Sequence, residues 1–294
     1  MMKKIITAIL IGTTMLGVSC GTATKEEVKE KEEEKRIVSA TVSATQVMDK
    51  LEVDLVGVPN TSKTLPERYV GATKIGQAFA PNFETIASLS PDLLVFDSNF
   101  KDKVEEQVKQ FGMNAFYFNT TNFTSFKESI TKLGEEVGEK SKAENLVKEL
   151  DNSVNEVLEK SKKSDVKPKV AVIFGTSESY MLATDKSYVG DLLNTIGVDN
   201  VTDSIDAVDS AYLNFSMEQI VEMNPDYILR LSHGNIEESI KAFNEEFANN
   251  PAWKGLDATK EGKVHDLDPE LFAVTANLSV TEAIKELGNI IYGE

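Results

Sequence analysis

One twelve-residue pattern occurs twice in this chain, at residues 84–95 and again at residues 218–229. Both copies have the form Glu-x-Ile-x-x-apolar-x-Pro-Asp-x-apolar-apolar, and they are 134 residues apart. Each copy predicts a short helix, a Pro-Asp turn and a buried strand. Because a whole helix-turn-strand unit is repeated, we expect two similarly built α/β lobes. A chain of 294 residues is long enough for each lobe to bury its own core.

A long amphipathic helix is predicted between the two copies. The capping box Ser141-Lys-Ala-Glu144 precedes apolar residues at helical spacing, which continue to about Lys162. Such a helix would be roughly 30 Å long and would suit a rigid bridge. We therefore expect an α/β fold of two lobes, each with a central and mostly parallel sheet, joined by one long bridging helix. The expected N-terminal lobe, bridging helix and C-terminal lobe are residues 36–138, 139–163 and 164–294.

Shorter patterns add elements to each lobe. Apolar runs bounded by polar or turn residues predict strands at residues 36–40, 55–58 and 169–174. Apolar residues at helical spacing predict helices at residues 45–51, 126–137 and 281–292.

The N-terminus indicates an export signal. Lys3 and Lys4 precede an apolar run at residues 5–18 that is too short to span a membrane comfortably. Ser-Cys-Gly follows at residues 19–21, and the segment resembles a lipobox in which Gly17 replaces the commonest Leu. We expect a lipoprotein signal peptide at residues 1–19 and lipidation of Cys20. An ordinary signal peptide with a chance cysteine is the alternative.

The segment after the signal is polar and rich in Lys and Glu, a composition that cannot bury enough apolar surface to order itself. We expect residues 20–35 to be a tether between a lipid anchor and the folded body, on the extracellular face of the cell membrane. Cys20 is the only cysteine, so no disulfide can form within the chain, and stability must come from packing.

The charge balance excludes several classes of partner. Lys and Arg total 31 against 48 Asp and Glu, which gives a net charge of −17. Nucleic acids and anionic lipid surfaces both require a basic surface, so the only membrane contact we expect is the lipid anchor. The arginines are Arg36, Arg68 and Arg230. A clamp for a polyanion would have to use Arg68 and Arg230, or do without guanidinium groups.

His233 follows an apolar run at residues 227–229 that predicts a buried strand. Gly234 and Asn235 are turn-forming residues, so the imidazole is expected on a loop at the carboxyl end of that strand. Ligands bind at this end of open α/β sheets. An ordinary surface histidine is the alternative. The other histidine, His265, is expected on a structural strand.

Five short segments carry a resemblance to one protein class. They are Lys-Thr-Leu-Pro-Glu-Arg-Tyr at 63–69, Ile-Gly-Gln at 75–77, Tyr-Met-Leu-Ala-Thr-Asp-Lys-Ser-Tyr at 180–188, Ile-Leu-Arg-Leu-Ser-His-Gly at 228–234 and Thr-Ala-Asn at 275–277. With the export signal, tether and two lobes, they resemble the substrate-binding proteins of ABC importers for siderophores, cobalamin or haem. Within that class they are most similar to the haem-receptor lipoproteins of the iron-regulated surface determinant (Isd) systems.

This resemblance covers nearly the whole chain. It implies a lipid-anchored haem-binding protein, not an enzyme, that delivers haem to an ABC permease dimer and its ATPase for iron acquisition. An upstream surface protein that donates haem is compatible with it. Closure between the lobes is expected to be small, because one long helix is a stiff hinge.

In that family, a His of the C-terminal lobe and a Met of the N-terminal lobe hold the haem iron. His233 falls on the His position, whereas Phe79 occupies the Met position. A phenyl ring has no lone pair to donate, so its expected role is to pack on the porphyrin face. The sixth ligand stays open between five-coordinate iron on His233 and a contribution from Met48, Met181 or Tyr180.

The resemblance also implies a site for the haem propionates. It places them at the N-terminus of the helix that begins near Ser43, Ala44 and Thr45, where backbone N–H groups and the helix dipole favour an anion. Ser43 or Thr45 could instead serve only as a helix cap.

Glu84 and Glu218 open the two copies of the repeat. In related binding proteins, the matching glutamates pair with Arg on the two permease subunits, and a pseudo-symmetric pair suits a two-fold partner. The alternative is that they stabilise helix N-termini. Exposed ion pairs are weak, so docking pairs would orient more than they bind.

Other functions fit the residues less well. A ferric siderophore receptor is the main alternative, and Lys63, Arg68 and Arg230 could serve it, although so few arginines disfavour an anionic chelate. A site for bare Mn or Zn would require three or four His or carboxylate ligands. The sequence contains neither a Ser-His-Asp signature nor a Gly-rich phosphate loop that would indicate an enzyme. Residues 186–191 are expected to form the start of a helix.

Overall fold

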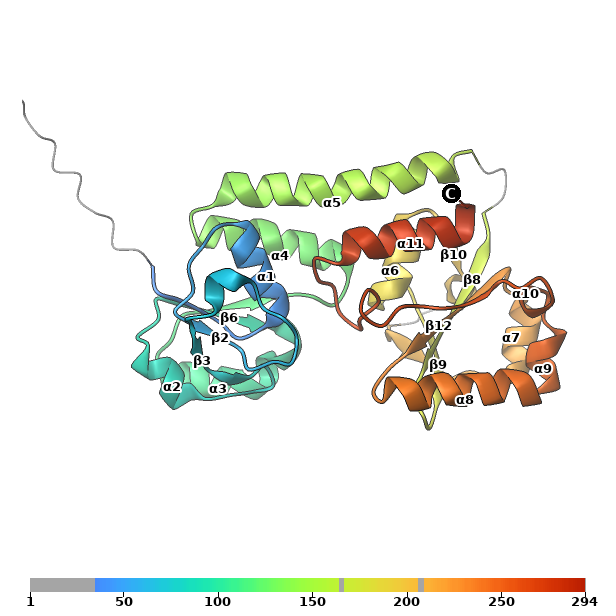
Figure 1. Cartoon of the computed structure of the whole chain (residues 1–294), viewed down its shortest axis with the longest axis horizontal. Coiled ribbons are helices and arrows are strands. Elements are labelled where there is room, and N and C mark those ends of the chain that lie inside the picture. The colour runs from blue at the N-terminus through green and yellow to red at the C-terminus, as the bar shows by residue number, and fades with distance from the viewer. Residues whose placement is uncertain (1–34, 164–166, 206–208, 294) are drawn as a thin grey trace, which may run out of the picture. The chain divides into compact units, whose positions relative to one another are not determined.

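The computed structural model describes residues 35–163, 167–205 and 209–293. These residues form two α/β lobes, each around its own sheet, with the long helix α5 (Lys140–Ser161) between them in the sequence (Figure 1). The predicted signal peptide at 1–19, Cys20 and all but the last residue of the predicted tether at 20–35 lie outside the described residues.

The sheet of the N-terminal lobe has the order β3-β2-β1-β6-β7, and all four neighbouring pairs are parallel. Its strands are β1 (Ile37–Ser39), β2 (Gly57–Val58), β3 (Thr73–Lys74), β6 (Leu93–Asp97) and β7 (Ala115–Phe118). The helices of this lobe are α1 (Val42–Lys50), α2 (Phe83–Ser88), α3 (Lys101–Gln110) and α4 (Phe123–Glu136). A small hairpin, β4 (Gly76–Gln77) and β5 (Ala80–Pro81), and the short 3₁₀ helices η1 (Glu67–Tyr69) and η2 (Ser98–Phe100) complete it.

The sheet of the C-terminal lobe has the order β11-β9-β8-β12-β13, and β10 also pairs with β8. Its strands are β8 (Lys169–Gly175), β9 (Tyr180–Ala183), β10 (Asp199–Asn200), β11 (Tyr212–Leu213), β12 (Tyr227–Ser232) and β13 (Val264–Asp266). Its helices are α6 (Tyr188–Thr195), α7 (Met217–Met223), α8 (Ile236–Asn249), α9 (Pro251–Gly255), α10 (Asp257–Lys260), α11 (Val280–Tyr292) and the 3₁₀ helix η3 (Val201–Ser204). Strands β10, β8, β12 and β13 pair in parallel, whereas β9 and β11 form an antiparallel edge.

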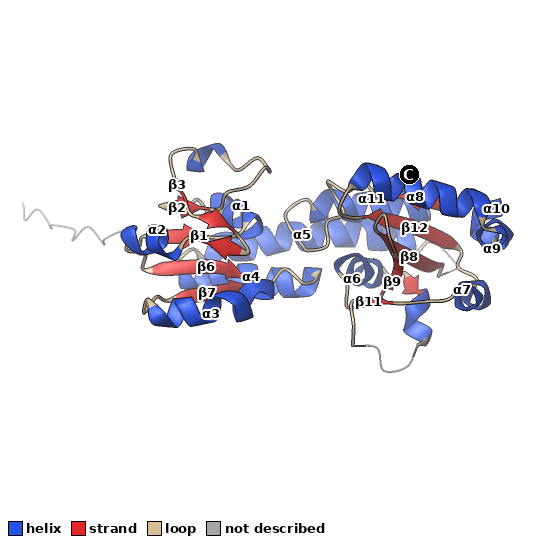
Figure 2. Ribbon diagram, turned by 90° about the horizontal axis from the view of Figure 1, so that it is seen from below, coloured by secondary structure: helices blue, strands red, loops and turns tan. Residues whose placement is uncertain are grey.

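The central strands are buried because helices flank each sheet (Figure 2). Every residue of β6 is buried, as are all but the first and the sixth residue of β8. Continuous apolar runs of this kind are typical of parallel strands that are covered on both faces. The predicted fold class is therefore confirmed, while the exact domain boundaries stay predictions. In the parts of the chain that the structure describes, no helix has both the length and the hydrophobicity needed to cross a membrane.

The two copies of the repeat fold in the same way. Each forms a short helix, α2 or α7, followed by a turn and a buried strand, β6 or β12. The residue before each Pro-Asp pair has a left-handed backbone, with φ of 46° at Ser90 and 40° at Asn224. This conformation ends the helix and directs the chain into the strand.

The aspartate in each copy of the repeat is hydrogen-bonded at the start of the first strand of its lobe. The carboxylate of Asp92 accepts the N–H of Arg36 at 2.8 Å, and that of Asp226 accepts the N–H of Lys169 at 2.7 Å. Each aspartate N–H also donates to the carbonyl of the same partner, at 2.8 Å in both lobes. The turn of each copy is thereby fixed to the start of the first strand of its lobe.

Two predicted helix caps are wrong. Helix α1 begins at Val42 rather than at residue 45, and its N-cap is Thr41, so neither Ser43 nor Thr45 caps it. The Thr45 hydroxyl instead donates to the carbonyl of Thr41 at 2.7 Å, one turn back. The predicted cap fails because hydroxyl residues inside a first turn can bond backwards as well as cap.

The capping box predicted at the start of helix α5 is wrong, although the helix lies within the predicted residues 139–163. The helix starts at Lys140, and the residue at its N-cap, Glu139, makes no side-chain cap, so the Ser141–Glu144 capping box does not form. Gly138 has φ of 81°, which reverses the chain after α4 within a few residues. The N–H of Glu139 then bonds the carbonyl of Gly134 at 2.7 Å, and α5 starts at once.

Helix α5 packs on a helix of each lobe. It lies alongside α4 and α11 (Figure 1). A Cβ on Gly134 of α4 would overlap the Cβ of Ala143, and a Cβ on Gly288 of α11 would lie 2.8 Å from Val157. Glycine is therefore needed at both positions for the helices to approach this closely. We call these two contacts the glycine seats of α5.

Candidate functional site

His233 lies on the loop between β12 and α8, and it is exposed. Its N–H donates to the carbonyl of Gly175 at 2.9 Å, at the end of the neighbouring strand. Its carbonyl accepts the hydroxyl of the buried Ser239 at 2.8 Å. The predicted placement at a strand's carboxyl end is confirmed, and the backbone there is held from both sides.

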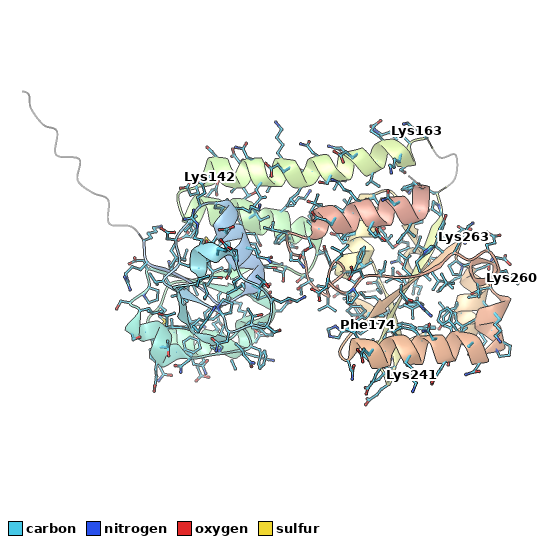
Figure 3. All side chains as sticks on the ribbon, viewed as in Figure 1. Lys142, Lys163, Phe174, Lys241, Lys260 and Lys263 are labelled. Atoms are coloured by element: carbon cyan, nitrogen blue, oxygen red, sulfur yellow. The ribbon has the colours of Figure 1, made fainter. Side chains whose placement is uncertain are left out.

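The imidazole of His233 packs on an aromatic ring. Its centroid is 5.3 Å from that of Phe174, the sixth residue of β8, and Phe174 is in turn 4.5 Å from the ring of Tyr212. Figure 3 labels Phe174 within the C-terminal lobe. Within the described residues, no hydrogen bond reaches the imidazole. The ring thus has one packed face and a remaining surface that is free to meet a ligand.

Sequence reasoning missed Phe174 and Tyr212. The register of β8 and β12 pairs Phe174 with Leu231, so Phe174 and His233, two residues on, share one face of the sheet. Both strands were predicted, and aligning their carboxyl ends would have indicated this pair. The antiparallel edge that carries Tyr212 has only two-residue pairing and leaves no comparable signal.

The three suggested additional iron ligands have different positions. Met48 is fully buried in the core of the N-terminal lobe, so it cannot reach a ligand. Tyr180 and Met181 are consecutive in β9 and therefore point to opposite faces. The Tyr180 ring packs on Phe243, 4.9 Å away, under α8. Met181 pairs with Phe174 across the ladder and shares its face.

Phe79 lies at the tip of the β4–β5 hairpin and is 55% exposed. The hairpin needs glycine at Gly76, where φ is 96° and a Cβ would lie 2.8 Å from the carbonyl oxygen of Ala80. The Phe79 ring is therefore open to solvent at the tip of a tight hairpin. No ring contact or hydrogen bond in the described residues joins Phe79 to His233.

Ser43, Ala44 and Thr45 are buried in the first turn of α1. The Ser43 hydroxyl donates to the carbonyl of Ala276 at 2.8 Å. The N–H of Thr45 bonds the carbonyl of Thr41 at 3.0 Å, whereas no hydrogen bond within the described residues engages the N–H groups of Ser43 and Ala44. Thr41 makes no side-chain cap, whereas α2, α4, α6 and α7 are all capped by a side chain.

The three arginines are committed to structural contacts. Arg230 is buried, forms a bidentate pair with Asp266, with Nε 2.7 Å from Oδ1, and lies over the rings of Phe243 and Phe247. Arg68 pairs with Asp54 at 2.7 Å, and this hydrogen bond raises its pKa. Arg36 donates to the carbonyl of Leu89.

Glu84 and Glu218 occupy equivalent positions, the second residue of α2 and of α7. Both are exposed, and no ion pair engages either of them within the described residues. Hydrogen bonds from its own backbone N–H and from Ser216 lower the pKa of Glu218, so it is ionised at neutral pH. Side chains of Asn82 and Ser216 already cap these helices.

Residues 37–271 match the periplasmic binding protein family. The chain belongs to that family. Its members are substrate-binding transport proteins rather than enzymes, which confirms the predicted class. Across residues 35–163, 167–205 and 209–293, no group of three or more His, Cys, Asp or Glu side chains is placed to hold a bare metal ion.

Among members of the periplasmic binding protein family, the chain is 36% identical to the high-affinity heme uptake system protein IsdE of Staphylococcus aureus. That match covers 289 residues, 98% of this chain and 97% of IsdE. The solved structure of S. aureus IsdE complexed with heme has a TM-score of 0.76 at 37% identity, covering 88% of this chain and 99% of that one.

Two other solved structures have the same fold. An ABC transporter substrate-binding protein from Listeria monocytogenes has a TM-score of 0.80 at 34% identity, covering 89% of this chain and all of that one. S. aureus SirA complexed with staphyloferrin B has a TM-score of 0.73 at 27% identity, covering 89% of this chain and 94% of SirA. Members of similar fold therefore hold different ligands.

Proposed function

We propose that this protein is the haem-binding component of an ABC importer and delivers haem to the permease for iron acquisition. The observation that carries the proposal is the exposed imidazole of His233, on a loop held from both sides at the carboxyl end of β12. A neutral imidazole is a common axial ligand of haem iron. The similarity to IsdE along nearly the whole chain supports the same ligand.

Phe79 supplies an apolar contact in this proposal. Its exposed ring would bury a large area against the porphyrin, because aromatic side chains stack on flat apolar partners. Met181 shares the face of Phe174 and thus the side of His233, so it is poorly placed to bind iron from the opposite side of the porphyrin. We therefore propose five-coordinate iron on His233.

The haem propionates would meet the first turn of α1. The N–H groups of Ser43 and Ala44 and the positive end of the helix dipole favour carboxylates there. Because the carbonyl of Ala276 now contacts Ser43, this segment would have to shift to admit a propionate.

A siderophore receptor is the alternative, and SirA with staphyloferrin B shows that the fold accepts another ligand. Anionic ferric chelates are best clamped by free guanidinium groups. Here Arg230 and Arg68 are paired with carboxylates, and Lys63 pairs with Glu270 at 2.7 Å. This chemistry favours haem over an anionic chelate.

The permease and its ATPase are implied partners, since the family consists of ABC substrate-binding proteins. We propose that Glu84 and Glu218 contact the two permease subunits. Lipidation of Cys20 would hold the protein on the extracellular face of the membrane.

The proposal is tested by titrating purified full-length protein with haemin and following the Soret band. His233→Ala is compared with His265→Ala, which removes the other imidazole, on β13, where it stacks on Tyr227. We expect saturable one-to-one binding that His265→Ala preserves and His233→Ala weakens by at least about tenfold, or 1.4 kcal/mol.

A missing Soret shift in the parent protein would overturn the haem proposal and favour the siderophore alternative. A shift that is identical in His233→Ala would keep haem as the ligand but remove His233 as the iron ligand.

A further inference from the structure

The packing around His233 differs from that of most metal-binding histidines. Such a residue usually donates its second ring N–H to a carboxylate or carbonyl, which fixes the ring orientation. In the described part of the chain, the His233 imidazole has no such partner. Its backbone is held by Gly175 and Ser239, but these bonds leave rotation about the side-chain torsions free.

The ring of Phe174 supplies the missing constraint. Its plane is tilted by 34° from that of the imidazole, with 5.3 Å between the centroids. Aromatic pairs at this separation are attractive beyond their buried area. One side of the imidazole is therefore covered by an apolar face, which restricts the ring rotations that remain.

Phe174 is itself well fixed. It lies on β8, the central strand that pairs with β9, β10 and β12. The Tyr212 ring packs on it at 4.5 Å. Burial raises the pKa of Tyr212 to about 12, so this neighbour stays a neutral phenol at physiological pH.

We propose that Phe174 is the positioning residue for His233, holding the imidazole plane by ring packing in place of a hydrogen bond. This inference rests on the proposed function, in which His233 binds haem iron. The iron ligand would then be an imidazole whose orientation is set from one side by the apolar ring of Phe174. Loss of the Phe174 ring should alter how the imidazole presents its nitrogen without removing the nitrogen.

The experiment compares Phe174→Leu with Phe174→Tyr, which keeps the flat ring, and with Phe247→Leu. The last variant removes another aromatic ring of the same lobe, one that stacks on Trp253 at 4.4 Å. Haemin dissociation is followed by transfer to excess apomyoglobin. The electron paramagnetic resonance spectrum of the ferric complex reports the orientation and uniformity of the axial imidazole.

We expect Phe174→Leu to bind haemin one-to-one, to release it about tenfold faster and to broaden the spectrum. Phe174→Tyr should restore both properties to within about twofold, and Phe247→Leu should leave both unchanged. The ring protons of His233 should also lose their ring-current shift in ligand-free Phe174→Leu, a readout that needs no haem.

Unchanged dissociation and an unchanged spectrum in Phe174→Leu would overturn the inference while leaving the proposed function intact, provided His233→Ala still loses haemin. If His233→Ala binds haemin as the parent protein does, both His233 ligation and the role of Phe174 are wrong. If Phe247→Leu matches Phe174→Leu, the effect reflects general loosening of the lobe, and the positioning role is likewise overturned.

Discussion

Asp191 is a partly buried carboxylate at the start of another helix. It lies in the first turn of α6, and its Oδ2 accepts the N–H groups of Phe123 at 2.8 Å and Thr124 at 3.3 Å, the first two residues of α4. Burial raises the pKa of Asp191, while the two backbone hydrogen bonds oppose that rise. The ordinary value for this carboxyl group is 3.8.

The raised pKa predicts a specific pH dependence for Asp191→Asn. The folded state keeps the proton to a higher pH than the unfolded chain, so this group costs the parent protein stability as pH rises from about 3.8 through the raised pKa. Asparagine does not titrate. The free energy of unfolding of Asp191→Asn relative to the parent should therefore increase from pH 3.5 to pH 7.

Urea unfolding at several pH values measures this difference. The control is Asp102→Asn, which makes the same substitution at an exposed residue in the first turn of α3. A relative stability that stays flat or falls with pH would show that the hydrogen bonds from α4, rather than burial, dominate the ionisation of Asp191.

Individual residues also show what sequence could predict of the site. The loop position of His233 followed from strand and turn chemistry alone. The covering of Ser43 could not be predicted, because Ala276 is 233 residues away in the chain. The pairing of Arg230 with Asp266 was also not predictable from the sequence, since it depends on the register of β12 and β13.

At the scale of elements, the repeat was the most reliable guide. It predicted α2 with β6 and α7 with β12, because a Pro-Asp turn and a run of buried apolar residues are local signals. Helix starts were less predictable. Capping residues compete with tertiary contacts and backward hydrogen bonds, as the first turns of α1 and α5 show.

The glycine seat between α4 and α5 predicts the effect of Gly134→Ala. Alanine gains about 1 kcal/mol of helix propensity, but its Cβ would overlap that of Ala143. Overpacking of this kind costs roughly 1–3 kcal/mol, so we expect a net loss of unfolding free energy. The measurement is urea unfolding at neutral pH.

The matched test of this seat is the exchange Gly134→Ala with Ala143→Gly. Each single variant should lose stability. The loss of unfolding free energy in the double variant should be smaller than the sum of the two single losses by about 1 kcal/mol. Strict additivity would mean that the two residues are not in contact.

At the scale of the molecule, the proposed docking glutamates predict a separation of binding from transport. Glu84→Ala and Glu218→Ala should each lower haem uptake through the permease by about two- to fivefold, since each removes one exposed ion pair. In the double variant, the fold-decrease in haem uptake should be roughly the product of the two single fold-decreases. Haemin binding should stay unchanged in all three.

Glu222→Ala is the matched control for docking, because Glu222 is exposed one turn further along α7. It should leave uptake unaltered. Uptake that is normal in the double variant would remove both glutamates from the docking surface.

The two-lobe architecture was predictable as a whole because it rests on a repeat, a long amphipathic helix and buried strands. Features that depend on distant partners were not. The antiparallel edge of β9 and β11, the Tyr212 ring behind Phe174 and the hydrogen bond from Ser43 all join segments with no local pattern that names the partner.

The two glycine seats also limit how far α5 can rotate against the helices on which it packs. Ala143 and Val157 are 14 residues apart on α5, which is close to four helical turns and roughly 21 Å, so both seats face one side of the helix. A rotation of about 10° pivoting on one seat would displace the other by nearly 4 Å over this arm. Contacts this tight tolerate a much smaller displacement. Any larger rotation must therefore be accommodated by bending of α5 itself.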